Sequence, residues 1–95
     1  MFNDANFRAV WQKLRPADKE VLKLLASGTT DLYSQPAREQ LGAVLGKPMP
    51  VDISTPQNSL RRLQDEELVV KLDYGDYQLQ DDAFAEWLRN LELDT

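Results

Sequence analysis

The stretch STPQNSLRRLQDEELVVKLDYGDYQLQD, residues 54–81, decides the fold because a capped helix and a hairpin follow one another in it. Ser54 is a good N-cap residue, and Gln57, three positions later, completes a capping-box pattern. Pro56 falls in the first turn, where its missing N–H costs nothing. The sequence therefore predicts a helix over residues 54–67 that begins at or near Ser54.

The predicted helix has two different sides. The positions that share one side at helical spacing are Pro56, Leu60, Leu63 and Glu67. We expect Leu60 and Leu63 to bury against the core of the domain. The opposite side carries Asn58, Arg61, Arg62 and Asp65.

Two strand-like segments follow the helix. Residues 68–72 are mostly apolar, residues 77–79 are a plausible return strand, and the Asp-Tyr-Gly-Asp sequence at residues 73–76 is a tight turn between them. A helix followed directly by such a hairpin is typical of the recognition helix and wing of a winged helix-turn-helix domain. In a helix-turn-helix the outward helix face enters the DNA major groove, where Asn58 suits an adenine edge and Arg61 a guanine edge.

Three further segments have helical patterns. Phe7, Val10, Trp11 and Leu14 predict an amphipathic helix over residues 2–14. A second helix is expected from about Pro16, with Gly28 as its cap. Asp81 or Asp82 caps a last helix, whose apolar positions are Phe84, Trp87, Leu88 and Leu91. We expect Trp11 and Trp87 to form a pair in the core.

A third helix precedes the deciding stretch. Ser34 and Pro36 open it and Gly46 ends it; its expected inward positions are Ala37, Leu41, Val44 and Leu45. Residues 29–33 before it are a connector or a one-rung strand, and residues 47–52 after it are a loop. The predicted fold class is mainly α with a small β-hairpin: a winged helix-turn-helix with a three-helix core, a two-stranded wing and extra N- and C-terminal helices, as one domain over residues 1–95.

Composition narrows the function classes. The 95 residues include no cysteine and no histidine, so disulfides, thiolate and imidazole chemistry and the usual zinc ligands are excluded. We find no nucleophile with a plausible base, and we expect no enzyme activity, metal or cofactor in this chain. Since no apolar run reaches the length of a membrane span and no signal peptide is evident, we expect a cytoplasmic domain without a membrane partner.

The charge is unevenly placed along the chain. The net charge is −5, but residues 1–50 carry seven basic and five acidic side chains, whereas residues 51–95 carry four basic and eleven acidic ones. The half that contains the expected recognition helix is therefore the acidic half.

Motifs along nearly the whole chain resemble one family, the C-terminal winged-helix domain of archaeal-type P-loop ATPases. These motifs are, in chain order, Trp11 and Leu14, Asp18-Lys19-x-Val21-Leu22-x-Leu24-Leu25-Ala26-x-Gly28, Tyr33-Ser34, Arg38-x-x-Leu41-Gly42, Ser54-x-x-x-x-Ser59-Leu60-x-x-Leu63, Leu68-Val69, Tyr77-x-Leu79-x-Asp81 and Phe84-x-x-Trp87-Leu88. The resemblance implies that the chain is a C-terminal fragment, with ATP and Mg bound in an upstream domain. One departure is Glu67, where such domains commonly have glycine; the sequence therefore argues against a left-handed helix cap there.

The candidate contact residues have more than one interpretation. They are Thr55, Asn58, Arg61, Arg62 and Tyr74. Arg61 has Asp65 four positions on and Arg62 has Glu66, so the arginines are expected more often to pair on the surface than to bind nucleic acid. Tyr74 is either an exposed anchor for a protein or packs over the hairpin.

Two function hypotheses remain. The preferred one is a non-catalytic regulatory or protein-interaction module at the C-terminus of a P-loop ATPase, which docks on its own ATPase core or on another protein. The alternative is a domain that binds double-stranded DNA through the helix at residues 54–67. Asp73 and Asp76 at the hairpin turn favour the first, because a DNA-binding wing needs cations against the phosphates.

Overall fold

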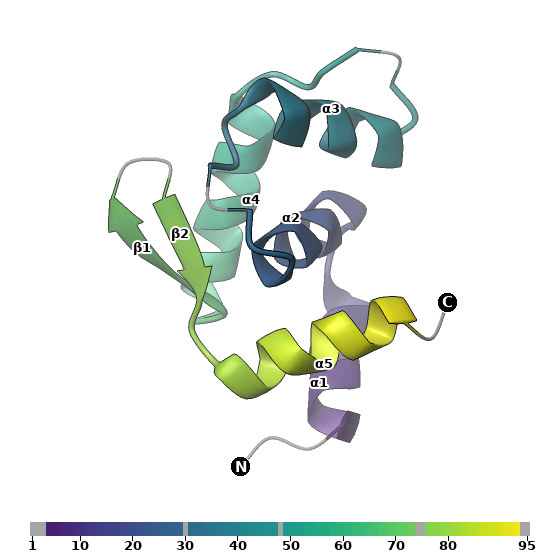
Figure 1. Cartoon of the computed structure of the whole chain (residues 1–95), viewed down its shortest axis with the longest axis vertical. Coiled ribbons are helices and arrows are strands. Elements are labelled where there is room, and N and C mark those ends of the chain that lie inside the picture. Colours follow the sequence, from purple (N-terminus) through teal and green to yellow (C-terminus); the bar gives the residue numbers. More distant parts are fainter. Residues whose placement is uncertain (1–3, 30, 48, 74–75, 94–95) are drawn as a thin grey trace.

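The fold is mainly helical with one antiparallel hairpin. The computed structural model describes residues 4–29, 31–47, 49–73 and 76–93. In these ranges the elements are α1 (Asp4–Lys13), α2 (Pro16–Ala26), α3 (Gln35–Val44), α4 (Ser54–Asp65), β1 (Val69–Asp73), β2 (Asp76–Leu79) and α5 (Asp82–Leu93), as Figure 1 shows. The predicted combination of helices with a small hairpin is confirmed.

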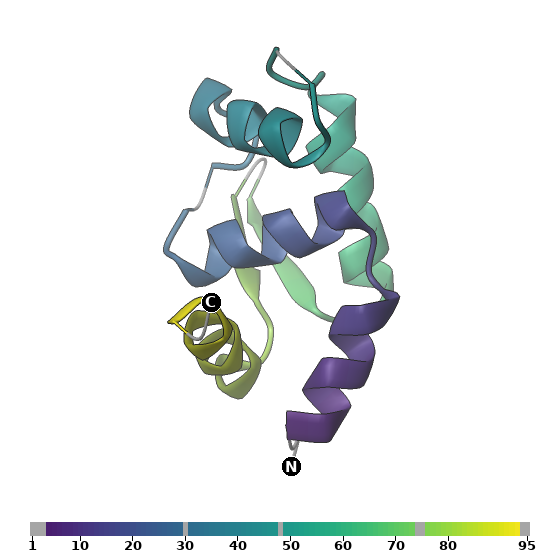
Figure 2. The ribbon, with the colours of Figure 1, turned by 90° about the vertical axis from the view of Figure 1, so that its right-hand side faces the viewer.

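Helix α2 lies at the centre of the molecule. It packs against α3, α4, α5 and β2, and Figure 2 shows α3 on one side of it and α5 on the other. The fully buried apolar side chains come from most of these elements and include Val21, Leu22, Leu32, Leu41, Leu60, Leu63 and Leu88. Leu60 and Leu63 are thus in the core, as their spacing predicts.

Aromatic contacts join the first helix to the last. The Phe7 ring stacks on Phe84 with centroids 5.1 Å apart, and Trp11 meets Trp87 edge to face at 6.1 Å. Phe7 and Phe84 are buried, whereas both tryptophans are half-buried at the margin of the core. The predicted contact between the tryptophans is confirmed, but the pair packs against the core and is not buried in it. The side chain of Leu91 lies outside the described part.

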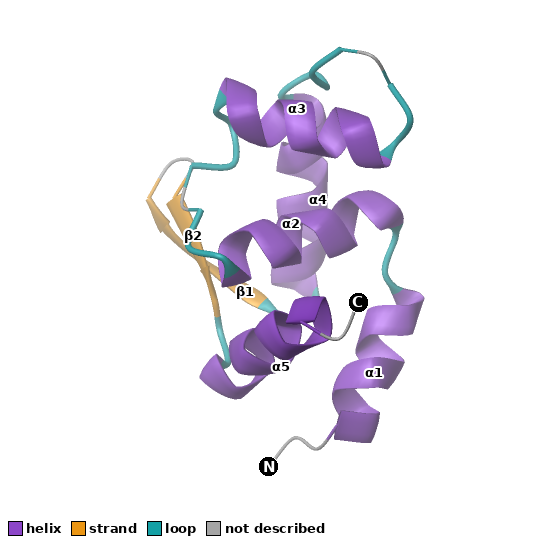
Figure 3. Ribbon diagram, turned by 45° about the vertical axis from the view of Figure 1, so that its right-hand side comes forward, coloured by secondary structure: helices purple, strands orange, loops and turns teal. Residues whose placement is uncertain are grey.

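The hairpin connects α4 to α5 (Figure 3). Val69 pairs with Leu79 and Lys71 with Tyr77, and the register shifts by one residue between Lys71 and Asp73. An isolated bridge between Asp31 and Asp76 adds one rung beside β2. The one-rung alternative for residues 29–33 is therefore the correct one.

Helices α2 and α3 end on glycines in the left-handed conformation. Gly28 has φ +101° and Gly46 has φ +75°, and the following residue in each case returns a hydrogen bond to the last turn: Thr29 N–H to the Leu24 carbonyl at 2.9 Å, Lys47 N–H to the Gly42 carbonyl at 2.8 Å. This is the Schellman arrangement, and it confirms both predicted glycine caps.

Helix α4 ends in the same way, but without glycine. Glu67 has φ +61°, its N–H donates to the Gln64 carbonyl at 2.9 Å, and the Leu68 N–H donates to the Leu63 carbonyl at 2.9 Å. The sequence-based argument against a left-handed cap at Glu67 was wrong. The two hydrogen bonds satisfy carbonyls that the helix end leaves open, and burial of Leu63 and Val69 on either side holds the turn in place.

Helix α4 begins at Ser54 as predicted, but its cap differs from the prediction. Ser54 is the first helical residue and not the N-cap, because Ile53 before it is already in the right-handed helical region. The Asp52 carboxylate accepts the Ser54 N–H at 3.1 Å, and the Asp52 carbonyl accepts the Thr55 N–H at 3.0 Å. Hydrogen bonding to Ser54, through its side chain and then its backbone N–H, lowers the pKa of Asp52. The Asp52 carboxylate, and not the Ser54 hydroxyl, therefore accepts a backbone N–H at the start of α4.

Two expected core positions of α3 are exposed. Ala37 and Leu41 are buried, but 44% of Val44 and 36% of Leu45 remain accessible. The chain after α3 doubles back, so that the Met49 carbonyl lies directly against buried Gly42, and the Val51 N–H donates to the Arg38 carbonyl at 3.1 Å. The returning loop covers α3 at Gly42 and leaves Val44 and Leu45 partly accessible to solvent.

Candidate functional site

The exposed face of α4 carries part of the predicted contact set. Asn58 and Arg61 are exposed there, and Thr55 is half-buried near the start of the helix. Among the described residues, Arg61 has no ion pair, so the expected pairing with Asp65 does not form. Tyr74 lies outside the described residues. Asn58 and Arg61 thus remain available for a partner.

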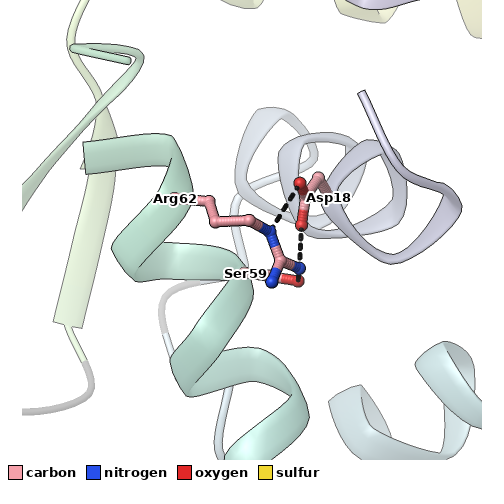
Figure 4. Close-up of polar contacts among 3 residues, drawn as sticks. All are labelled: Asp18, Ser59 and Arg62. Atoms are coloured by element: carbon pink, nitrogen blue, oxygen red, sulfur yellow. Dashed lines mark hydrogen bonds and ion pairs between the residues drawn. The ribbon is translucent and has the colours of Figure 1, made fainter. Parts of the chain in front are cut away.

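Arg62 points inward, against the prediction. Its Nη2 donates to Asp18 Oδ1 at 2.8 Å and its Nε to Asp18 Oδ2 at 3.1 Å, while Nη2 also reaches Ser59 Oγ at 3.2 Å (Figure 4). Asp18 is 3% exposed and Ser59 is fully buried. The carboxylate that accepts these hydrogen bonds raises the pKa of Arg62. Arg62 therefore links α2 to α4. It is neither paired with Glu66 nor free to contact a partner, which were the two expectations from the sequence.

A signal for this pair was present in the sequence. Asp18 stands at helical spacing with Val21, Leu22 and Leu25, which are the buried positions of α2. A buried carboxylate needs a cation or several hydrogen bonds, since an unpaired charge in the core costs far more than a surface charge. The pattern could have shown that some basic residue must face Asp18, although not which one.

A polar hollow lies between α4 and the hairpin. It has a volume of about 290 Å³ and is lined by Tyr33, Gln57, Arg61, Gln64, Lys71 and Tyr77; we call it the α4–hairpin hollow. Gln57, Arg61 and Gln64 lie at i, i+4 and i+7 along α4, which places them on one side of the helix. Lys71 and Tyr77 are direct partners across the hairpin.

Tyr33 is brought to the hollow by the connector before α3. Its N–H donates to Asp31 Oδ1 at 3.0 Å, and its carbonyl accepts Arg38 Nε at 3.1 Å. Arg38 Nη1 also donates to the Val51 carbonyl at 3.5 Å, which ties the connector to the loop before α4. The position of Tyr33 is therefore fixed from both sides by hydrogen bonds to its backbone.

A second hollow, of about 300 Å³, lies between α1 and α4, and the Asp18–Arg62 pair forms part of its lining. Its lining carries both signs of charge: Lys13, Arg15 and Arg62 against Asp18, Asp65 and Glu66. The α4–hairpin hollow differs, because two cations line it and no carboxylate does.

No family model, no curated protein and no solved structure matches this chain. Its function must therefore be argued from the residues and their geometry alone.

The far end of the hairpin is acidic. Asp73 is paired with Asp76 in the register, and Asp76 also bridges to Asp31. Three aspartates are thus neighbours in the backbone pairing at the turn end of the hairpin. Such a cluster repels phosphate, because affinity for duplex DNA rests largely on cationic contacts.

The remaining chemistry is limited in the part of the chain that the structure describes. No group of three or more acidic side chains there is placed to hold a metal ion. None of the helices in the described ranges has both the length and the apolar character needed to cross a bilayer. The α4–hairpin hollow brings hydrogen-bond donors and cations together on one surface, which suits binding of a ligand or partner.

Proposed function

We propose that this chain is a winged-helix domain that acts as a non-catalytic protein-interaction module at the C-terminus of a P-loop ATPase. The exposed face of α4 and the adjoining hollow would dock on the ATPase core of the same protein or on another protein. ATP and Mg would be bound by the upstream domain, not by this one.

The order of the elements supports the winged-helix assignment. Helix α2 is followed by the single rung at Asp31, by α3 and α4, and by the β1–β2 hairpin, and α2 packs against both other helices. Helices α1 and α5 are additions at the two ends. In this assignment α4 is the recognition helix and the hairpin is the wing.

The observation that carries the choice of a protein partner is the loss of Arg62 from the outer face of α4. With Arg62 bound to Asp18, Arg61 is the remaining arginine of α4, and the wing end carries Asp73 and Asp76. A duplex presents about one negative charge per 1.7 Å of its axis and requires a stripe of cations. A protein partner requires only local complementarity.

A cross-linking experiment tests this proposal. These 95 residues contain no cysteine, so once any cysteines of the upstream domain are replaced by serine, Asn58→Cys carries a single benzophenone on the outer face of α4. The coding sequence upstream of Met1 should encode a P-loop ATPase domain, and irradiation of the labelled full protein should join position 58 to that domain. Lys47→Cys, exposed at the end of α3, is the matched control and should give few such products. An upstream sequence without a phosphate-binding loop would refute the ATPase assignment.

One observation favours the alternative, a DNA-binding domain. Arg61 and Lys71 line the hollow between α4 and the wing with no carboxylate among the lining residues. Fluorescence anisotropy of a labelled short random duplex, measured with the domain at increasing salt concentrations, distinguishes the two functions. The protein-interaction proposal predicts no binding at physiological ionic strength. Tight binding that falls steeply with salt and weakens in Arg61→Ala would establish the alternative instead.

A further inference from the structure

We propose that the α4–hairpin hollow receives one carboxylate side chain of a protein partner, from a segment in which that acidic residue is flanked by basic ones. This inference rests on the protein-interaction function proposed above and adds the chemistry of the partner.

The hollow is rich in hydrogen-bond donors. Arg61 and Lys71 carry charged N–H groups and Gln57 and Gln64 carry amide N–H groups, while Tyr33 and Tyr77 complete the lining. These groups come from α4, both strands and the connector at Tyr33, which are far apart in the sequence. Their convergence without a carboxylate favours an anion over a neutral or cationic ligand.

The identity of the cations favours a carboxylate. The planar guanidinium of Arg61 can donate two parallel hydrogen bonds to a carboxylate, and Lys71 adds a second positive charge from across the hollow. Among the described residues Arg61 has no ion-pair partner of its own. It can therefore bind an incoming anion without first breaking an internal salt bridge.

The size of the hollow limits what enters it. About 290 Å³ is at the lower end of the range for pockets that hold a complete small ligand, and the hollow is open to solvent along α4. A single side chain presented by a larger molecule fits this space, with the rest of the partner lying on the surrounding surface.

The surroundings of the hollow decide what must flank the carboxylate. Asp65 is one turn beyond Arg61 on α4, and Asp73 and Asp76 lie at the end of the hairpin that supplies Lys71 and Tyr77. At physiological ionic strength, salt largely screens the interaction between exposed charges that are more than a Debye length of about 8 Å apart, so these aspartates act mainly on groups that bind close to them. A ligand that is acidic throughout, such as a duplex, meets these aspartates, whereas basic residues beside one glutamate are attracted by them.

The test uses a short synthetic peptide with one central glutamate and a lysine on either side, separated by serines. Titration into the isotope-labelled protein, followed by amide chemical shifts, should move the signals of Gln57, Arg61, Gln64 and Lys71. The same peptide with glutamine in place of glutamate should bind at least tenfold more weakly, because a charged carboxylate accepts stronger hydrogen bonds from a guanidinium than a neutral amide oxygen does.

Three variants with equal charge change locate the site. Arg61→Gln and Lys71→Gln should each weaken the glutamate peptide about tenfold. Lys47→Gln alters the net charge by the same amount at an exposed position outside the hollow and should leave the affinity within twofold. All three replaced side chains are exposed, so folding is preserved and checked by the unshifted core signals.

The contrary outcomes separate failure of the carboxylate site from failure of the protein-interaction function. Equal binding of the glutamate and glutamine peptides, equal loss in all three variants, or no binding of the glutamate peptide overturns the carboxylate site. These results leave the cross-linking test of the protein-interaction function untouched. Shifts at the hollow caused by a random DNA duplex, and abolished in Arg61→Gln, would overturn both proposals in favour of DNA.

Discussion

The Asp18 carboxylate on α2 is held by the Arg62 guanidinium on α4 through hydrogen bonds of 2.8 and 3.1 Å, although the two residues are 44 positions apart. The pair is buried on the aspartate side, while 37% of the arginine side chain remains accessible. Together with the buried side chains of Leu60 and Leu63, the pair holds α4 in one rotation about its axis relative to α2. In that rotation Gln57, Arg61 and Gln64 line the hollow beside the hairpin, so the internal ion pair helps to position the proposed binding surface.

Removal of Arg62 should destabilise the domain strongly. In Arg62→Ala the buried Asp18 loses its cation, and because the arginine is partly exposed we expect a loss of about 2–4 kcal/mol in the free energy of unfolding. Urea denaturation followed by circular dichroism measures it. Arg61→Ala, the adjacent exposed arginine, is the control and should change stability by less than about 0.5 kcal/mol.

A double variant separates the charge from the packing. Asp18→Leu combined with Arg62→Met replaces the pair by apolar groups, and it should be more stable than Arg62→Met alone, since no buried charge is left unpaired. An Arg62→Ala variant as stable as Arg61→Ala would show that the ion pair does not hold the two helices together.

Gly42 should tolerate no side chain. A Cβ at position 42 would collide with the Met49 carbonyl oxygen, a backbone atom that cannot rotate away. Gly42→Ala should therefore cost about 1–3 kcal/mol and shift the amide signals of residues 49–51. Gly46→Ala is the comparison, because it meets no atom within 4 Å but has φ +75°, so its cost of about 1 kcal/mol should come without those shifts. Unchanged signals at residues 49–51 in Gly42→Ala would contradict the close packing.

Much of the fold follows from local signals in the sequence. Leu60, Leu63, Phe84 and Leu88 are buried as their spacing predicts, and Gly28 and Gly46 end their helices because glycine enters the left-handed region without cost. The start of α4 at Ser54 was predicted correctly, but the capping residue was not, because Asp52 and Ser54 are both suitable cap residues two positions apart and local sequence alone does not rank them.

The candidate site was only partly predictable. Asn58 and Arg61 are exposed as the helical pattern predicts. The residues that line the hollow together with Arg61 depend on how the hairpin and Tyr33 fold back on α4, which the local sequence does not show. The sequence assigns Arg62 to the outer face because it lies at i+4 from Asn58 and three positions before Asp65, opposite the side of Leu60 and Leu63. Its long side chain instead reaches Asp18, and a rule based on spacing cannot choose between these directions.

The acid sensitivity of the domain should depend in part on Asp52. Hydrogen bonding to Ser54 lowers the pKa of Asp52 from its ordinary 3.8 in the folded protein. A carboxyl with a depressed folded-state pKa stabilises the fold above its unfolded pKa, and this contribution is lost as pH falls through the folded value. Asp52→Asn keeps the oxygen acceptor but does not titrate, so the difference in Tm between wild type and Asp52→Asn should shrink as pH falls from 6 to about 2.5. A difference that is independent of pH would show that the Asp52 charge plays no part in capping α4.

Glu67 should be a position where glycine is better than the natural residue. A non-glycine residue at φ +61° is strained by about 1 kcal/mol or slightly more, and replacement by glycine removes this strain. Part of the resulting gain in stability is offset by the greater freedom of glycine in the unfolded chain. Glu67→Gly should therefore raise the free energy of unfolding by about 0.5–1 kcal/mol. Glu66→Gly, one residue earlier at φ −86°, is the matched control and should lower it by a similar amount. If Glu67→Gly also lowers stability, the Glu67 side chain makes a contribution larger than the backbone strain, and its place beside Phe7, Leu68 and Phe84 is where that contribution should be sought.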